Sequence, residues 1–344
     1  MPLSETDVRA ALREVKYPGF SRDIVSFGLV KSVNIDNGEV KVQLALATND
    51  PAVPQTIKAD TERVLRAIAG VQSAKVLIDI HAPPAGAGVG AMQLPGIRHV
   101  IAVASGKGGV GKSTVAANLA VALDQAKARV GLCDCDIYGP SISLMFGTRE
   151  RPMATEENRI VPVEQYNLKL MSMGFLLDDT SPAILRGPMV TRYTQQFLRQ
   201  VEWGELDYLV LDLPPGTGDI QLTIVQTVAL SGAIIVTTPQ EVALIDARKA
   251  ATMFEKVNVP VLGLIENMSY FISPSDGKRY DIFGSGGGER EAKRLRVPLL
   301  GQIPIDIATR EAGDRGMPIV AEDRQSPVTA EFDKIARRIQ EALA

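Results

Sequence analysis

The sequence predicts an α/β protein with a mostly parallel, doubly wound sheet, preceded by a small α+β domain. Three observations indicate this. A glycine-rich turn at 105–111 separates an apolar strand from a helical pattern. Further apolar strands alternate with helices long enough for parallel crossovers. A glycine- and proline-rich linker at 82–96, without helix or strand periodicity, separates this region from a shorter one.

Residues 1–81 form the first predicted domain. Its expected elements are a capped helix over 4–15, a strand over 40–46 after a hairpin turn at Asn37-Gly38, a helix over 57–68 and a strand over 76–80. Together they make a helix–strand–strand–helix–strand unit that is small but large enough to fold alone.

Residues 97–344 form the second predicted domain. Its apolar strands are expected at 100–104, 129–133, 209–212, 233–237, 261–265 and 299–303. The final helix carries Phe332, Ile335, Ile339 and Leu343 on one face. A sheet of this kind, covered on both sides, binds its ligand at the carboxyl ends of its strands.

The glycine-rich turn fits a phosphate-binding loop at every defined position of Gly106-x-x-x-x-Gly111-Lys112-Ser113. Glycines let successive N–H groups point at a phosphate, and the following helix start adds its own free N–H groups. Lys112 would reach the β- and γ-phosphates, and Ser113 would offer its hydroxyl to Mg²⁺. Such a turn can be purely structural, but strand, lysine, hydroxyl and helix occur together here. The predicted nucleotide site comprises Gly106, Lys107, Gly108, Gly109, Val110, Gly111, Lys112, Ser113 and Thr114.

Acidic residues follow two of the predicted strands. Asp212 begins a proline- and glycine-rich turn and could hold Mg²⁺ directly or through water. Asp134 and Asp136 flank Cys135 at another strand end, where either could orient water or bind metal. An aspartate there can instead cap the next helix. Two acidic ends in one such sheet favour a functional role for Asp212 and Asp136 over Asp134 and Asp219.

Composition narrows the classes of partner. The formal net charge is −3, which gives no indication of a nucleic-acid or membrane-surface partner. No early segment resembles a signal peptide, and no apolar run approaches the length of a membrane span. The two cysteines, Cys133 and Cys135, exclude a disulfide framework and fit a reducing cytoplasm. We expect a cytoplasmic protein that binds neither nucleic acid nor membrane.

The segment Lys107-Gly-Gly-Val-Gly-Lys-Ser-Thr114 resembles the deviant phosphate loop of the MinD, ParA and nitrogenase-iron-protein group. Five further segments narrow the resemblance: 134–141, 186–189, 212–219, 238–243 and Glu266-Asn-Met-Ser-Tyr270. Together they resemble the Mrp/ApbC iron–sulfur cluster carriers, ATPases that load clusters and pass them to apoproteins. The match spans nearly the whole chain. The first 80 residues are similar to a small domain often fused to these carriers and also found alone in cluster-assembly proteins.

The resemblance implies ATP and Mg²⁺ as cofactors and assigns catalytic roles to Lys107, Lys112, Asp136 and Asp212. Lys107 would reach the phosphates of the partner subunit in a homodimer, where a second cation neutralises charge that develops during transfer. Asp136 would polarise the attacking water, and Asp212 would support Mg²⁺ together with Ser113.

The resemblance also assigns a base-binding role to Asn267, which would read the adenine edge with its side-chain amide. Pro239 and Gln240 would lie nearby. Without the resemblance, Asn267 would be interpreted as a turn residue at a strand end.

The sequence departs from these carriers at the cluster. The resemblance implies a [4Fe–4S] cluster held across the dimer by a Cys-Pro-x-Cys pair, but Ser273 and Asp276 stand at the two cysteine positions. Such clusters are normally held by soft thiolates. Val53-Pro54 likewise stands where the small domain often has a cysteine before proline. Cys133 and Cys135 should share a face at their strand end, but two thiolates there would crowd the nucleotide, and packing against the switch is the favoured role.

Three functions remain open. The first is an Mg-ATP hydrolase that acts with apoproteins or assembly factors in iron–sulfur protein maturation. The second is a positioning factor like ParA or MinD, which the balanced charges of the last helix disfavour. The third is a nucleotide-switched assembly adaptor with little turnover. The sequence favours the first.

Overall fold

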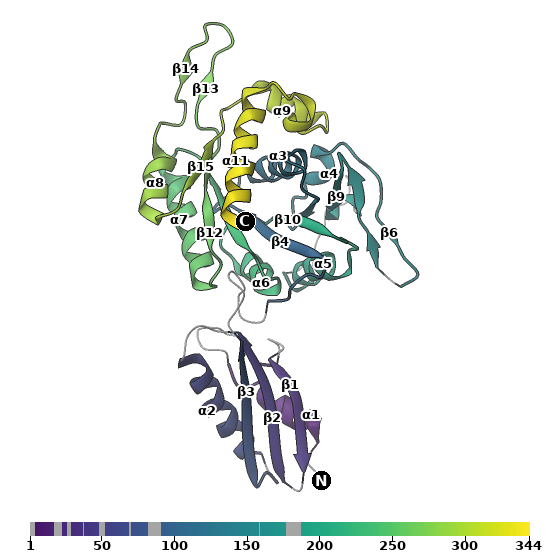
Figure 1. Cartoon of the computed structure of the whole chain (residues 1–344). Helices are drawn as coiled ribbons and strands as arrows, with labels where there is room; N and C mark the ends of the chain where they lie inside the picture. The colour runs from purple at the N-terminus through teal and green to yellow at the C-terminus, as the bar shows by residue number, and fades with distance from the viewer. Residues whose placement is uncertain are drawn as a thin grey trace. The chain divides into compact units, whose positions relative to one another are not determined.

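The computed structural model describes residues 4–16, 23–25, 29–36, 38–47, 52–68, 70–81, 91–157, 159–176 and 187–344. The chain divides into two compact units, Met1–Ala91 and Met92–Ala344 (Figure 1). Each has its own buried apolar core. The linker proposed over 82–96 falls largely outside the described residues.

The first unit contains α1 (Glu5–Leu12), β1 (Val30–Asp36), β2 (Glu39–Ala47), α2 (Ala52–Arg66) and β3 (Ser73–His81). β2 is the central strand, antiparallel to β1 and parallel to β3. Ser4 caps α1 as predicted, in a capping box with Asp7. α2 begins at Ala52 rather than at the predicted Ile57. Pro54 permits this early start, because it lies in the first turn of the helix, where a missing N–H costs no helical hydrogen bond.

The second unit is built on an eight-stranded sheet in the order β15-β12-β11-β4-β10-β5-β9-β8. Its strands are β4 (Ile97–Ala104), β5 (Val130–Asp134), β8 (Val163–Gln165), β9 (Leu168–Met171), β10 (Leu206–Asp212), β11 (Gly232–Thr237), β12 (Val261–Glu266) and β15 (Leu299–Gln302). Every pairing is parallel except that of β8 with β9. The mostly parallel sheet and its six predicted strands are confirmed, and β8 and β9 extend it beyond the prediction.

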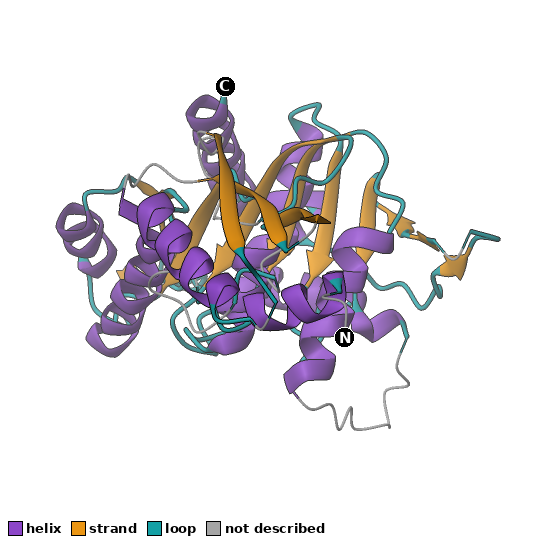
Figure 2. Cartoon of the chain, turned by 90° about the horizontal axis from the view of Figure 1, so that it is seen from below, coloured by secondary structure: helices purple, strands orange, loops and turns teal. Residues whose placement is uncertain are grey.

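Helices cover both faces of this sheet, so the doubly wound architecture is confirmed (Figure 2). Side chains of β11 alternate between two cores. Ile234 and Val236 pack with residues of α3 (Lys112–Gln125) and α11 (Pro327–Leu343), whereas Ile235 packs with residues of α7 (Glu241–Lys256) and α8 (Gly287–Leu295). Period-two alternation therefore places the two helical layers on opposite faces.

The remaining helical segments are α4 (Ile142–Met145), η1 (Met173–Phe175), α5 (Gly187–Gln200), α6 (Asp219–Thr227), α9 (Ile307–Asp314) and α10 (Ile319–Glu322). Two short strand pairs complete the unit, β6 (Met153–Ala154) with β7 (Ile160–Val161), and β13 (Phe271–Ile272) with β14 (Arg279–Tyr280). The β13–β14 hairpin projects from the second unit at the top of Figure 1. Within the described ranges, no helix has both the length and the apolar character needed to span a bilayer.

Candidate functional site

The glycine-rich turn joins the end of β4 to the start of α3 and is held tightly by its neighbours. A Cβ at Gly106 would overlap the backbone carbonyl of Asp246 in α7. Gly111 has a φ of 77°, and a Cβ there would overlap the side-chain amide of Asn267. Both positions therefore require glycine, one for close approach and the other also for its left-handed backbone.

The turn also leaves room for an anion. Nothing lies within 4 Å of where a Cβ would stand at Gly109. α3 begins at Lys112 with Gly111 as N-cap and has no side-chain cap. Its first N–H groups therefore lack an internal acceptor, which is the arrangement that binds phosphate at a helix start.

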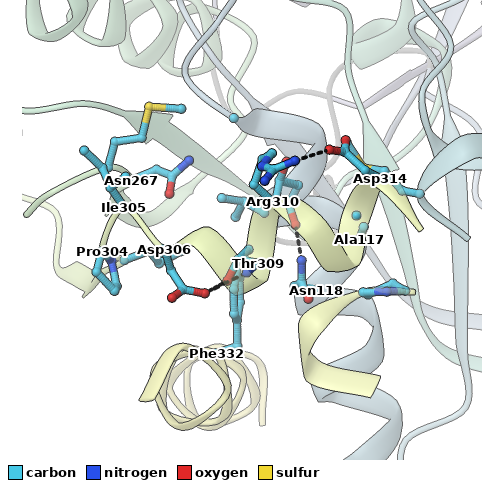
Figure 3. Close-up of a pocket in the computed structure, with 18 of the residues that line it drawn as sticks. Ala117, Asn118, Asn267, Pro304, Ile305, Asp306, Thr309, Arg310, Asp314 and Phe332 are labelled. Atoms are coloured by element: carbon cyan, nitrogen blue, oxygen red, sulfur yellow. Dashed lines mark hydrogen bonds and ion pairs between the residues drawn. The ribbon is translucent and has the colours of Figure 1, made fainter. Parts of the chain in front are cut away.

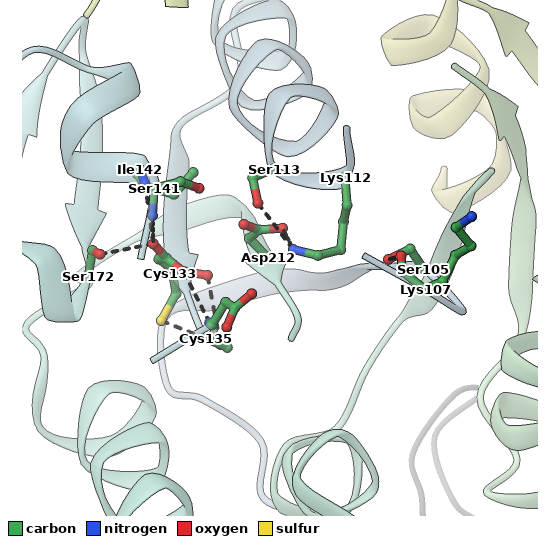
Figure 4. A network of polar contacts seen from close by, with 12 residues as sticks. Ser105, Lys107, Lys112, Ser113, Cys133, Cys135, Ser141, Ile142, Ser172 and Asp212 are labelled. Carbon is green, nitrogen blue, oxygen red and sulfur yellow. Dashed lines mark hydrogen bonds and ion pairs between the residues drawn. The ribbon is translucent and has the colours of Figure 1, made fainter. Parts of the chain in front are cut away.

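Lys112, Ser113 and Asp212 meet beside this helix start (Figure 4). The ammonium group of Lys112 donates one hydrogen bond to Asp212 Oδ1 and another, at 3.2 Å, to Ser113 Oγ. Asp212 is fully buried, and its Oδ2 has no hydrogen-bond partner in the part of the chain that the structure describes. A buried carboxylate oxygen without a partner is costly. This oxygen and the Ser113 hydroxyl are hard ligands of the kind that Mg²⁺ prefers, so these residues fit that cation.

Lys107 lies in the same loop, but its side chain points away from Lys112 and Asp212 (Figure 4). Its backbone carbonyl accepts a hydrogen bond from Ser105 Oγ at 2.9 Å, which fixes the start of the turn. The two lysines of the loop are therefore directed to different places.

Asp134 is buried at the end of β5, and its hydrogen bonds hold the loop that follows. Its carboxylate accepts hydrogen bonds from the backbone N–H groups of Asp136, Ser141 and Ile142 and from Ser172 Oγ, at 2.9–3.3 Å. Burial, followed by the neighbouring Asp212 carboxylate, raises the pKa of Asp134 to about 7.

Asp136 is half-buried, and burial raises its pKa while the Lys112 ammonium group lowers it. Lys112 therefore acts electrostatically on both Asp134 and Asp136. Asp136 is the more accessible carboxylate for contact with water, whereas Asp134 shapes the loop that carries it.

Cys133 and Cys135 lie on the same side of the chain, as predicted, with their sulfur atoms 3.9 Å apart. Both are fully buried and reduced. The hydrogen bond with Cys133, together with burial, raises the pKa of the Cys135 thiol. The raised pKa of Cys135 and the burial of both thiols disfavour thiolate chemistry, so the two side chains act as part of the packed interior.

A cavity of about 420 Å³ adjoins the first turn of α3 (Figure 3). Gly111 and Thr114 form the wall next to the turn. Asn267, Pro304, Ile305 and Phe332 are among the other lining residues. This size and mainly apolar lining are typical of pockets for small organic ligands.

Asn267 is buried in the wall of this cavity. Its side-chain nitrogen donates to the backbone carbonyl of Val110 at 2.8 Å. Asn267 therefore ties the strand end of β12 to the glycine-rich turn. The side-chain oxygen is then the atom that could accept a hydrogen bond from an adenine amino group.

Pro239 and Gln240 are not among the residues that line this cavity. Gln240 is the N-cap of α7, and the carbonyl of Pro239 lies against Gly287 at the start of α8. The structure thus brings Asn267 to the turn and leaves these two residues beside α7 and α8. Their contact with nucleotide stays a prediction.

Ser273 and Asp276 occupy the tip of the β13–β14 hairpin, where local hydrogen bonds satisfy them. Ser273 Oγ lies 2.8 Å from Ser275 Oγ. The Asp276 carboxylate accepts from the Lys278 N–H at 3.1 Å and from the Tyr280 hydroxyl at 3.2 Å. The hydrogen bond from the Lys278 N–H is the main cause of a lowered pKa at Asp276. In the described part of the chain, no three His, Cys, Asp or Glu side chains are grouped to hold a metal.

Comparison with known proteins places this geometry in a family. The family description "NUBPL iron-transfer P-loop NTPase", within the ParA group, matches residues 96–340. This chain belongs to that family. A second description, iron–sulfur cluster assembly protein, matches residues 5–78 in the first unit. The predicted membership is confirmed.

Named relatives of this NTPase family support the same placement. An iron–sulfur cluster carrier protein of Synechocystis is 44% identical over 344 residues, covering 98% of this chain and 97% of its own length. A nucleotide-binding protein from Archaeoglobus fulgidus, solved in complex with ADP, is 40% identical with a TM-score of 0.61, covering 70% of this chain and 94% of its own. The cell-division ATPase MinD of Pyrococcus furiosus is 26% identical with a TM-score of 0.53, covering 71% and 99%.

Residues 303–306 line the cavity but were missed as candidate site residues. Ile303-Pro304-Ile305-Asp306 carries no motif, and most of its chemistry is apolar. Its position could have indicated a role, because the segment follows the carboxyl end of β15, and such sheets bind ligands at that edge.

Proposed function

We propose that the chain binds and hydrolyses Mg-ATP as the nucleotide-driven component of iron–sulfur cluster transfer to apoproteins. The observation that carries the proposal is the meeting of Lys112, Ser113 and Asp212 beside an uncapped helix start, next to a cavity of about 420 Å³. Family membership and relatives named as cluster carriers support the choice of cargo.

The proposed nucleotide lies with its phosphates in the glycine-rich turn and its base in the cavity. Free N–H groups at the start of α3 would bind the phosphates. The base would lie among apolar side chains such as Ile305 and Phe332, with Asn267 at its polar edge. Binding therefore requires little rearrangement of the backbone at the turn.

Lys112 would exchange its acceptor when the nucleotide binds. In the structure its ammonium group donates to Asp212. The triphosphate carries more negative charge than one carboxylate, so Lys112 would move to the phosphates and leave Asp212 for the cation. Bound Mg²⁺ would neutralise charge on the phosphate oxygens, and Ser113 and Asp212 would hold the cation. Asp136 would accept a hydrogen bond from the attacking water and orient it toward the γ-phosphate.

We further propose that the active form is a homodimer in which Lys107 acts on the partner's nucleotide. Lys107 points away from its own Lys112 and Asp212, which supports a role across an interface. Most large apolar side chains exposed on the described part of the chain lie in segments that follow the carboxyl ends of β5, β11, β12 and β15: Tyr138, Leu144, Val242, Ile245, Ile272, Tyr280, Ile282, Ile307 and Met317. Exposed apolar side chains in the segments after these strand ends support an interface on that side.

The cluster cargo would not take its ligands from the hairpin of this chain. Ser273 and Asp276 offer hard oxygen atoms that are already hydrogen-bonded within the turn. Thiolates from an apoprotein or an assembly factor would therefore complete the cluster's coordination. We keep the cytoplasm as the expected location, because a chain with only two cysteines, both buried, fits a reducing compartment.

Titration of the protein with Mg-ATP in a calorimeter, followed by phosphate release, tests the nucleotide function. We expect saturable binding and turnover in the wild type, with turnover reduced at least about a hundredfold in Lys112→Ala and Asp136→Ala. Binding with wild-type turnover no faster than both variants would indicate the adaptor function. Absence of binding would reject the proposal.

Anaerobic reconstitution with iron and sulfide tests the cargo. We expect the isolated wild type to hold no stoichiometric cluster in Mössbauer spectra, and an apoprotein added with Mg-ATP to acquire one faster than without the chain. No acceleration of cluster transfer would reject the carrier role while leaving the nucleotide site intact.

A further inference from the structure

Glu266 is a fully buried carboxylate at the end of β12, directly before Asn267. In the described part of the chain, Glu266 forms no ion pair with a lysine, arginine or histidine. A buried carboxylate without a cation is retained only where hydrogen bonds satisfy it.

Three segments supply those hydrogen bonds. Oε1 accepts from Ser269 Oγ at 2.6 Å and from Gln302 Nε2 at 2.7 Å. Oε2 accepts from the backbone N–H of Gly288 in the first turn of α8. The free N–H groups and positive end of that helix favour a negative charge at this position.

The glycines before α8 follow from this contact. A Cβ at Gly288 would lie 2.8 Å from Glu266 Oε2, so the helix start approaches the carboxylate only without a side chain. The run Gly284-Ser-Gly-Gly-Gly288, which resembles a phosphate loop in composition, instead receives a carboxylate from the same chain.

Ser269 and Gln302, which donate to Glu266, belong to two segments with different roles. Gln302 directly precedes the segment 303–306 that lines the cavity. Ser269 directly precedes Tyr270 and Phe271, which begin the β13–β14 hairpin.

The two segments are joined by backbone hydrogen bonds. Ser269 N donates to Ile303 O at 2.9 Å, and Ile305 N donates to Tyr270 O at 2.6 Å. Asn267, between Glu266 and the hairpin, donates to the glycine-rich turn. Glu266 thus stands where the nucleotide turn, the cavity wall and the base of the hairpin meet.

We propose that Glu266 is a positioning residue that couples the nucleotide cavity to the β13–β14 hairpin by holding Ser269 and Gln302 on one carboxylate oxygen. The inference rests on the proposed nucleotide function. A ligand that orders residues 303–306 would, through Gln302, Glu266 and Ser269, also order the base of the hairpin.

The test compares Glu266→Gln with Glu291→Gln. Glu291 is also a buried glutamate, but it pairs with Arg248 and has no contact with Gln302 or Ser269 among the described hydrogen bonds. In Glu266→Gln, one amide oxygen replaces two carboxylate acceptors, and the amide NH₂ must face a donor, either the Gly288 N–H or the Ser269 and Gln302 pair.

Hydrogen exchange of the amides at 269–272 and 303–306 is measured with and without Mg-ADP. In the wild type and in Glu291→Gln, we expect nucleotide to slow exchange in both segments. In Glu266→Gln we expect about tenfold weaker Mg-ADP binding, as for a lost buried hydrogen bond. At saturation, protection at Ile303 and Asp306 should remain, while that at 269–272 and at Ile305, whose N–H donates to Tyr270 O, is lost. A purely structural role would lower stability without separating the two segments.

Ser269→Ala provides a milder variant if Glu266→Gln does not fold. It removes the hydroxyl that joins the hairpin to Glu266 and leaves the Gln302 contact, so protection of 269–272 should be lost with affinity within about twofold of wild type. Protection of both segments in Glu266→Gln, or in Ser269→Ala where it is the folded variant, would overturn the inference and leave the nucleotide function intact. A wild type that does not bind Mg-ADP or Mg-ATP would overturn both.

Discussion

The ammonium group of Lys112 donates a hydrogen bond to Oδ1 of Asp212, and both side chains are buried. Lys112 begins α3 and Asp212 ends β10, so the contact joins the glycine-rich turn to the strand beside it. The pair neutralises charge that would otherwise be costly inside the protein. It also means that two groups assigned to the nucleotide and the metal stabilise one another before either ligand arrives.

Lys112→Ala should therefore destabilise the nucleotide-free protein. Removal of one partner from a buried ion pair costs about 3–5 kcal/mol, so we expect the free energy of unfolding of the second unit to fall by about 3 kcal/mol in urea denaturation. Adding Asp212→Asn should recover part of the loss. Lys249→Ala is the matched control: Lys249 forms an exposed pair with Asp246, and its removal should cost less than about 1 kcal/mol. Equal losses in the two single variants would contradict the interpretation.

Asp134 should make the metal-free protein less stable as pH rises. Its folded pKa is about 7, above the ordinary value of 3.8, so the folded state binds this proton more tightly than the unfolded state. The free energy of unfolding should then decline between about pH 4 and about pH 7, by roughly 2–4 kcal/mol from this group. Denaturation of wild type and Asp134→Asn across this range, in EDTA, measures the difference between their slopes. Parallel curves would show that Asp134 is already ionised in the folded state.

Asn267→Ala should weaken binding of the nucleoside more than binding of the phosphates. The variant loses the amide that donates to Val110 and the oxygen proposed to face the base. We expect Mg-ATP affinity to fall about tenfold in calorimetry, while the affinity for inorganic tripolyphosphate changes less than about twofold. A matched loss for both ligands would mean that Asn267 acts only by shaping the turn.

Thiols at the hairpin tip should create a cluster site. Ser273→Cys combined with Asp276→Cys replaces two hard oxygen ligands with soft thiolates on an exposed turn. After anaerobic reconstitution, we expect the double variant to hold a [4Fe–4S] cluster shared by two chains, as Mössbauer spectra and iron analysis would report. Ser275→Cys alone, one thiol on the same turn, is the control and should hold none. Failure of the double variant would indicate that the hairpin cannot place two thiolates on one cluster.

The elements that the sequence predicts well are those with strong local signals. Val100–Ala104, the glycine-rich turn and the helix from Lys112 are strand, turn and helix in the predicted order. Long apolar runs likewise predict β10, β11 and β12. β8 and β9 are only three and four residues long, too short for a periodic signal, and β9 is fixed by pairing with β5.

The candidate site divides in the same way. The turn and Asp212 are recognisable because motif and strand position coincide, whereas Asn267 is recognisable only through the family resemblance. The cavity segment 303–306 and the carboxylate of Glu266 are not, because their roles depend on contacts between segments distant in sequence. The contact of Lys112 with Asp212 spans 100 positions and could not be read from either motif alone.

Glu266 also affects which helix starts are free to attract an anion. The start of α8 already accommodates a carboxylate, whereas the starts of α3 and α6 follow glycine and have no side-chain cap. Inorganic phosphate analogues should therefore leave the start of α8 empty. An acid of the chain itself thus blocks one glycine-rich helix start, and phosphate recognition is left to the helix starts that no carboxylate fills.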